Sequence, residues 1–210
     1  LHIGGVRTAL YNYLFAKKLQ GTFVLRIEDT DQSRYVPQAE QYIIDSLDWA
    51  NIPFDEGPGK NEKYGPYRQS ERKNIYKDHI QTLITKGHAY YAFDTAKELD
   101  TLRQEAQDKK EVFSYNQHNR ETLKNSLNTN INTEDLISKG NYVIRFKTPN
   151  NQELAMTDLI RGKVNVNTAN LDDKILFKSD GMPTYHFANI VDDHLMKITH
   201  VIRGEEWLPS

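Results

Sequence analysis

The stretch LHIGG at residues 1–5 runs directly into the segment 6–18, whose apolar residues recur at helical spacing, and then into a β-rich run that ends in RIEDTD at residues 26–31. Small residues at the start of a helix let a ligand approach the backbone, and the free N–H groups there favour negative charge. A histidine beside them can donate a hydrogen bond to a phosphate oxygen. The sequence therefore predicts an anion site at the start of the first helix, formed by His2, Gly4 and Gly5.

Helix and strand patterns alternate over residues 1–88. The run 23–27 suits a buried parallel strand, and further helices are predicted from about Pro37 and over residues 70–86, where Gly87 supplies the stop. This alternation is typical of an α/β fold with a doubly wound parallel sheet, in which ligands bind at the carboxyl ends of the strands.

The pattern changes near residue 89. Charge-rich segments at 96–110 and 120–127 read as helices, and 142–147 alternates like a strand, which predicts a small α+β domain inserted into the sheet. Strand and helix signals of the first kind then resume and end with a predicted strand at 200–203. The predicted regions are 1–88, the first half of the sheet domain; 89–173, the inserted domain; and 174–210, the start of the second half.

Composition sets limits on the partners and cofactors. The chain has 210 residues, is 38% hydrophobic with 12 Tyr and 8 Phe, and can therefore fill a core. It has no Cys, which excludes disulfides and thiolate metal sites within this sequence. No apolar run approaches the roughly 20 residues that span a bilayer, so we expect no membrane partner. A net charge of −2 gives no general attraction to nucleic acid, although a local basic track is sufficient for binding RNA.

Four segments follow the first stretch in a fixed order. They are RIEDTD at 26–31, GPYRQSER at 65–72, FKSDGMPTYHFANIVDDHLM at 177–196 and HVIRGEEWLPS at 200–210. Together with HIGG at 2–5, this set resembles the class I aminoacyl-tRNA synthetases and, within them, the bacterial-type glutamyl-tRNA synthetases. The resemblance covers residues 1–91 and 142–210.

The resemblance implies a Rossmann-type catalytic domain, split by an inserted α+β domain that binds the tRNA acceptor stem. It implies ATP-dependent activation of L-glutamate to glutamyl-adenylate and transfer to the 3′-terminal adenosine of tRNA(Glu). ATP with Mg²⁺ is then the co-substrate, no zinc is expected, and the enzyme is expected to be a cytoplasmic monomer. We expect the strand before the first loop and the lysine-bearing KMSKS-type loop to lie outside this chain, so that the fragment alone is inactive.

The resemblance also implies roles for single residues. His2 and Gly4 would stabilise charge at the α-phosphorus, and Gly5, Glu206 and Trp207 would contact ATP. Glu28 would pair with the substrate ammonium group, and Arg203 would meet the γ-carboxylate with its guanidinium fork. Tyr185 and Asn189 would orient the glutamate. Arg34 and Arg68 are either contacts to the tRNA end or ordinary surface residues, and the roles of Asp29 and Asp31 are left open.

Three other interpretations are open to these motifs. His186 and His194, with Asp192 and Asp193, are a weak candidate for a zinc site because they lack an i, i+4 histidine pair. A glutamyl-queuosine tRNA(Asp) synthetase paralogue would share the same motifs. A catalytically silent tRNA- or partner-binding module would be expected to have lost His2, Glu28 or Arg203, and the sequence keeps all three.

Overall fold

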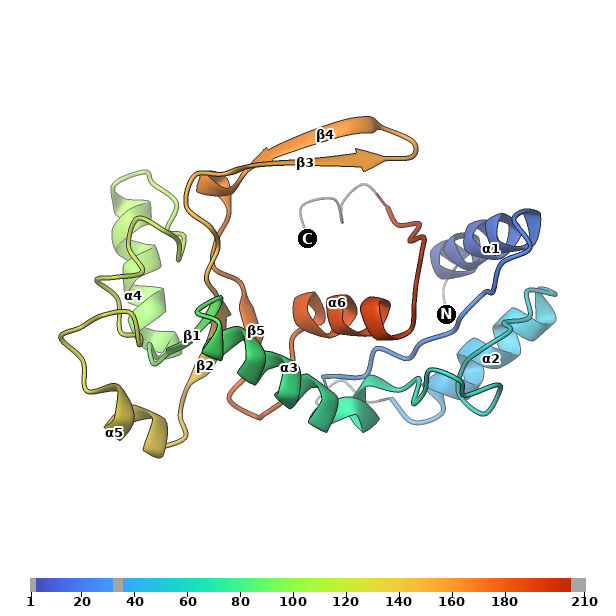
Figure 1. Ribbon diagram of the computed structural model, residues 1–210, viewed down its shortest axis with the longest axis horizontal. Helices are drawn as coiled ribbons and strands as arrows, with labels where there is room; N and C mark the ends of the chain where they lie inside the picture. Colours follow the sequence, from blue (N-terminus) through green and yellow to red (C-terminus); the bar gives the residue numbers. More distant parts are fainter. Residues whose placement is uncertain (1–2, 32–35, 205–210) are drawn as a thin grey trace. The chain divides into compact units, whose positions relative to one another are not determined.

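The computed structural model describes residues 3–31 and 36–204, and they divide into two compact units (Figure 1). One unit combines the chain up to Tyr76 with the chain from Tyr185 onward, and the other is the continuous segment Lys77–Thr184. The second unit therefore interrupts the first in sequence, and it contains the predicted insertion at 89–173.

Helices build most of the discontinuous unit. They are α1 (Ile3–Lys18), α2 (Ala39–Trp49), a 3₁₀ helix (Gln69–Arg72), the first residues of α3 (Lys73–Thr85), and α6 (Tyr185–Leu195). Its core is formed by Phe23, Leu47, Ile52 and Phe54, with Ile43 and Ile44 packed against them. The helix predicted from about Pro37 is thereby confirmed as α2.

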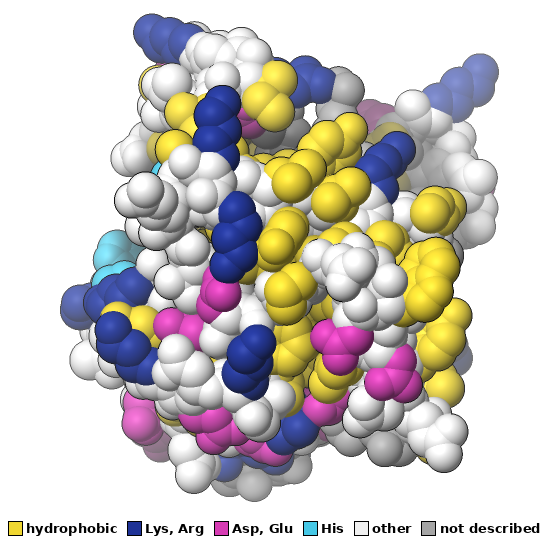
Figure 2. Space-filling view, turned by 90° about the vertical axis from the view of Figure 1, so that its right-hand side faces the viewer, with side chains coloured by type: hydrophobic (Ala, Val, Ile, Leu, Met, Phe, Trp, Pro, Cys, Tyr) yellow, Lys and Arg dark blue, Asp and Glu magenta, His cyan; other side chains and the backbone are white. Residues whose placement is uncertain are grey.

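Part of the apolar surface of α1 and α2 remains exposed. Figure 2 shows hydrophobic side chains gathered on the face of the molecule that carries these two helices. Tyr11 and Leu14 on α1 and Tyr42 and Trp49 on α2 are more than half exposed. Among the described residues, no helix is long and apolar enough to cross a membrane.

The segment 23–27, which was expected to be a parallel strand, is not a regular strand, although two of its residues make parallel hydrogen bonds. The amide of Leu25 donates to the Glu56 carbonyl (2.9 Å) and that of Ile27 to the Tyr67 carbonyl (2.8 Å). In the described part of the chain, the parallel pairs appear only as the isolated bridges Val24–Glu56 and Ile27–Arg68. The partner segments leave at once, the first into a turn at 57–60 and the second into the 3₁₀ helix. The strand predicted at 200–203 is likewise absent.

Antiparallel sheets organise the continuous unit. Strands β1 (Ala89–Ala92), β2 (Val143–Phe146) and β5 (Ile175–Phe177) pair in the order β1-β2-β5, while β3 (Glu153–Asp158) and β4 (Gly162–Asn167) form a hairpin. The helices are α4 (Ala96–Asp108) and α5 (Thr133–Ser138). The helix predicted at 120–127 was wrong, because these residues form turns.

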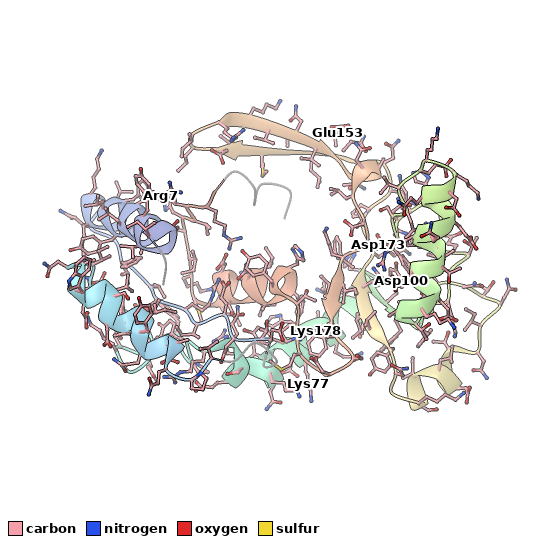
Figure 3. The ribbon with its side chains drawn as sticks, turned by 180° about the vertical axis from the view of Figure 1, so that it is seen from behind. Arg7, Lys77, Asp100, Glu153, Asp173 and Lys178 are labelled. Atoms are coloured by element: carbon pink, nitrogen blue, oxygen red, sulfur yellow. The ribbon has the colours of Figure 1, made fainter. Side chains whose placement is uncertain are left out.

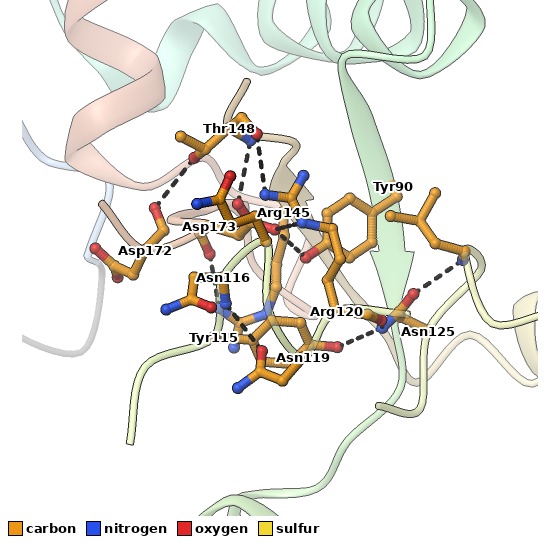
Figure 4. A network of polar contacts seen from close by, with 12 residues as sticks. Tyr90, Tyr115, Asn116, Asn119, Arg120, Asn125, Arg145, Thr148, Asp172 and Asp173 are labelled. Carbon is orange, nitrogen blue, oxygen red and sulfur yellow. Dashed lines mark hydrogen bonds and ion pairs between the residues drawn. The ribbon is translucent and has the colours of Figure 1, made fainter. Parts of the chain in front are cut away.

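A buried polar network centres on Asp173, in the continuous unit (Figures 3 and 4). The Tyr90 hydroxyl donates to its Oδ2 (2.6 Å), and the Thr148 amide donates to Oδ1 (3.1 Å). Arg120 Nε forms an ion pair with Oδ2 at 3.1 Å, and Arg145 Nη1 donates to the Asp173 carbonyl at 2.8 Å. Because the Arg120 guanidinium is buried, the carboxylate of Asp173 balances charge that water does not reach.

Asp55 ties the end of α1 to the segment that follows it. Lys17 Nζ lies 2.8 Å from Asp55 Oδ1, and the Phe23 amide donates to Oδ2 at 2.8 Å. Partial burial raises the pKa of Asp55, but the hydrogen bonds from Lys17 and Phe23 outweigh it and hold the pKa below its ordinary value. A carboxylate with a lowered pKa stabilises the fold above its unfolded-state pKa of about 4, and this contribution is lost as the pH falls through the folded-state pKa.

Replacing Asp55 with asparagine is therefore expected to lower the stability measurably near pH 7 and to matter progressively less below about pH 4. Urea denaturation of the wild type and of Asp55→Asn over a series of pH values measures this difference. A difference that stays constant down to pH 3 would show that the carboxylate charge is not its cause.

Candidate active site

A cavity of about 880 Å³ opens in the discontinuous unit. Its lining comes from α1, from the segment at 21–28, from the start of α6 and from residues 196–203. Three predicted site residues, Glu28, Tyr185 and Arg203, line this one cavity although they are far apart in the sequence. The structure thus brings together a carboxylate, a phenol and a guanidinium on a common wall.

Tyr185 and Arg203 lie next to each other at the cavity. Tyr185 is the first residue of α6, and the guanidinium carbon of Arg203 is 5.4 Å from the centre of its ring. Burial raises the pKa of Tyr185 and the charge of Glu28 adds to that rise, while the charges of Arg203 and Arg26 and a hydrogen bond with Asn189 work against it. The Tyr185 hydroxyl therefore remains protonated at neutral pH and can donate a hydrogen bond.

Arg26 connects the site residues and was not predicted from the sequence. Its Nη2 donates to Glu28 Oε1 (3.0 Å) and to Asn189 Oδ1 (2.9 Å), and its Nη1 donates to Asp193 Oδ1 (2.7 Å). Burial lowers the pKa of Arg26, but the bonds to Asp193 and Glu28 outweigh this and raise it. The sequence did contain a signal, since a charged residue inside the apolar run 23–27 requires a partner when the run is buried.

Asp192 and Asp193 are adjacent on α6, and each holds this helix to other segments of the chain. Asp192 is fully buried and accepts hydrogen bonds from Arg72 Nε (2.7 Å), Gln69 Nε2 (2.9 Å) and the Tyr76 hydroxyl (2.8 Å). Asp193 forms an ion pair with Arg26, with Nη1 and Oδ1 2.7 Å apart. In the ranges 3–31 and 36–204, no three His, Asp or Glu residues gather in an arrangement that could hold a metal ion.

Two other polar residues of the motifs hold local structure. Asp29 accepts the backbone amide (2.8 Å) and the hydroxyl (2.6 Å) of Ser70, beside the 3₁₀ helix. Arg68 meets Glu40 of α2 through two bonds of 2.8 and 2.7 Å and reaches Glu71 at 3.1 Å. The hydrogen bonds to Glu40 raise the pKa of Arg68. Its guanidinium is thus paired with two glutamates, and its side chain is 36% exposed.

The predicted nucleotide-binding residues are described only in part. Gly4 and Gly5 lie in the first turn of α1, which begins at Ile3 rather than at Val6 as expected. The start of a helix favours negative charge, so both glycines lie where an anion can approach the backbone. His2, Arg34, Glu206 and Trp207 lie outside the described residues.

Comparisons with known proteins agree with the motifs. Residues 1–210 match the family model of the tRNA synthetases class I (E and Q), catalytic domain. The glutamate–tRNA ligases of Christiangramia forsetii and Flavobacterium psychrophilum are 64% and 63% identical to the chain, which is covered completely. The chain spans 42% of the length of each of these relatives.

A solved structure of a relative has the same fold as this chain. The crystal structure of a glutamate tRNA ligase from Elizabethkingia meningosepticum, in complex with its amino acid, superposes with a TM-score of 0.93. It is 54% identical, and the match covers all of this chain and 42% of that one. The class I synthetase fold predicted from the motifs is confirmed by these matches. The chain belongs to the family of class I tRNA synthetases for glutamate and glutamine.

Proposed function

We propose that the protein containing this chain is a glutamate–tRNA ligase, which activates L-glutamate with ATP and transfers it to tRNA(Glu). The observation that carries this proposal is the cavity wall on which Glu28, Tyr185 and Arg203 meet. The relatives named glutamate–tRNA ligase support the same choice of amino acid.

The charges at the cavity suit glutamate. An arginine fork matches a carboxylate in charge and geometry but gives an amide no charge-balanced pair, so Arg203 favours glutamate over glutamine. The Oε1 atom of Glu28 accepts a hydrogen bond from Arg26. Within the described residues this leaves Oε2 to accept the substrate ammonium group. The Tyr185 hydroxyl adds a neutral donor between these two charges.

The proposed chemistry requires positioning more than a covalent nucleophile. An oxygen of the glutamate α-carboxylate attacks the α-phosphorus of ATP, the bond to pyrophosphate breaks, and glutamyl-adenylate forms. A ribose hydroxyl of the terminal adenosine of tRNA then attacks the glutamyl carbonyl, and AMP leaves. Mg²⁺ bound to ATP supplies charge neutralisation for the first step.

Further residues are proposed for the nucleotide and the tRNA. His2, Gly4 and Gly5 would face the phosphates, and Glu206 and Trp207 would face the adenosine. The unit Lys77–Thr184 would bind the acceptor stem, and Arg34 would contact the tRNA end. Arg68 could do so only by exchanging its Glu40 partner. Since tRNA and ATP are the proposed substrates, we place the activity in the cytoplasm.

ATP–pyrophosphate exchange by the full-length protein tests this proposal. Exchange is expected to be much faster with glutamate than with glutamine, and it is expected to require tRNA(Glu). Exchange with glutamate in the absence of tRNA would favour the glutamyl-queuosine tRNA(Asp) synthetase instead. No exchange under either condition would favour a binding module without catalytic activity.

A further inference from the structure

We propose that Arg26 is a positioning residue for glutamate, because it fixes the hydrogen-bonding direction of Asn189 and the place of the Glu28 carboxylate. This inference rests on the proposed function and assigns a task to a residue that does not itself need to contact the substrate.

Arg26 contacts two segments that line the site, α6 and the end of its own segment at Glu28. Its side chain is only 12% exposed, and its two terminal nitrogens bond to Asp193 and Asn189 on α6 and to Glu28 at the end of its own segment. One guanidinium thereby holds two parts of the chain that are separated by about 160 residues in sequence. A planar fork with several fixed donors can hold three acceptors in this way, whereas an ammonium group on a flexible stem cannot fix the same directions.

The bond to Asn189 determines what that side chain can offer. Asn189 is 3% exposed, and its Oδ1 accepts from Arg26. Its Nδ2 is buried and has no hydrogen bond of good geometry among the described residues, although it lies close enough to the Tyr185 hydroxyl to lower the pKa of that group. A buried donor that lacks a well-directed partner is costly, so this group is suited to an acceptor that arrives with a ligand. With its oxygen held by Arg26, the amide presents only N–H groups, which match a carboxylate oxygen of glutamate.

Loss of Arg26 would remove this preference. The Asn189 amide could then rotate and present its oxygen to the substrate carboxylate, an arrangement of two acceptors that repel each other. Glu28 would also lose its cationic neighbour and could leave the position proposed for the ammonium contact. Both changes act on glutamate and neither acts directly on ATP.

Steady-state exchange kinetics of the full-length protein test this inference. Arg26→Gln is expected to raise KM for glutamate by about 10- to 100-fold, while KM for ATP changes by less than about twofold. Arg26→Lys should restore only part of the loss, because it keeps the charge but not the fork. In an Asn189→Ala background the effect of Arg26→Gln should be smaller than in the wild type, since part of it acts through Asn189.

Arg72→Gln is the matched control. Arg72 is more deeply buried than Arg26 and anchors the same helix through Asp192, but its hydrogen bonds go to Asp192 and to backbone carbonyls such as that of Pro66, not to Asn189 or Glu28. It is expected to lower the melting temperature without changing KM for glutamate. An equal rise of KM in both variants, or an unchanged KM in a folded Arg26→Gln protein, would overturn the inference.

A failure of the proposed function can be distinguished from a failure of this inference. If the wild type shows no exchange, calorimetric titration with glutamate decides the matter. Glutamate binding that is weakened by Arg26→Gln and not by Arg72→Gln would keep the positioning role and refute only the activity. Absence of glutamate binding to the wild type would refute both.

Discussion

Replacing Arg203 with alanine is expected to reduce kcat/KM for glutamate by about 10²- to 10³-fold, the cost of leaving a bound carboxylate without its charged partner. Arg203 lies beside Tyr185 on the wall of the cavity and is the guanidinium proposed to meet the γ-carboxylate. Because glutamine carries no charge at this position, its already low rate should fall much less. The ratio of the rates with glutamate and glutamine should therefore shrink, and ATP–pyrophosphate exchange by the full-length protein measures it.

Two variants separate this effect from a general loss of positive charge. Arg203→Lys keeps the charge and should recover part of the activity. Lys18→Ala removes an exposed positive charge at the end of α1, and it should leave the kinetics unchanged. If Arg203→Ala lowered the rates with glutamate and glutamine by the same factor, Arg203 would not be the residue that selects the amino acid.

Replacing Asp173 with asparagine is expected to destabilise the protein by about 3–5 kcal/mol, because it leaves the buried Arg120 without its carboxylate partner. Arg120 is 2% exposed, so water cannot take over this role. Urea denaturation measures the loss. Hydrogen exchange should locate it in the segment Lys77–Thr184, which contains the whole network.

The neighbouring residue provides the control. Asp172 pairs with Lys174 at 2.9 Å, and both side chains are about two-fifths exposed. Exposed pairs of this kind contribute only about 0–1 kcal/mol, so Asp172→Asn should have almost no effect. Similar losses in the two variants would mean that burial of the Asp173 charge is not the cause.

The helices could be predicted where an apolar face repeats and is covered. Ile43, Ile44 and Leu47 follow this pattern in α2 and pack into the core. The helix predicted at 120–127 does not form, because two polar residues there make hydrogen bonds and ion pairs that a helix would not allow. Arg120 turns to Asp173, and Asn125 donates to the Tyr115 hydroxyl (2.8 Å) and to the Arg120 carbonyl. Tertiary hydrogen bonds of this kind leave no trace in local periodicity.

The site was predicted through its motifs, and its internal connections were not. Glu28, Tyr185 and Arg203 could be named because they stand in ordered segments that resemble a family, and the structure places them on one cavity. Arg26 was missed because a sequence shows neither that Asn189 and Asp193 lie within its reach nor that their helix returns to it. The parallel strand expected at 23–27 is reduced to bridges for a related reason, since its partners turn away after one or two residues.

The interruption of one unit by the other sets an order of events during protein synthesis. The ribosome makes Arg26 and Arg72 early, but their acceptors on α6 appear only after the whole segment Lys77–Thr184 has been made. At about 5–20 residues per second, roughly a hundred intervening residues take on the order of 5–20 seconds. During that time the two arginines have none of their α6 carboxylates. The proposed glutamate site takes Tyr185 and Asn189 from α6 and Arg203 from beyond it, so it can assemble only after Lys77–Thr184 has been made, and a nascent chain that stops before α6 holds no such site.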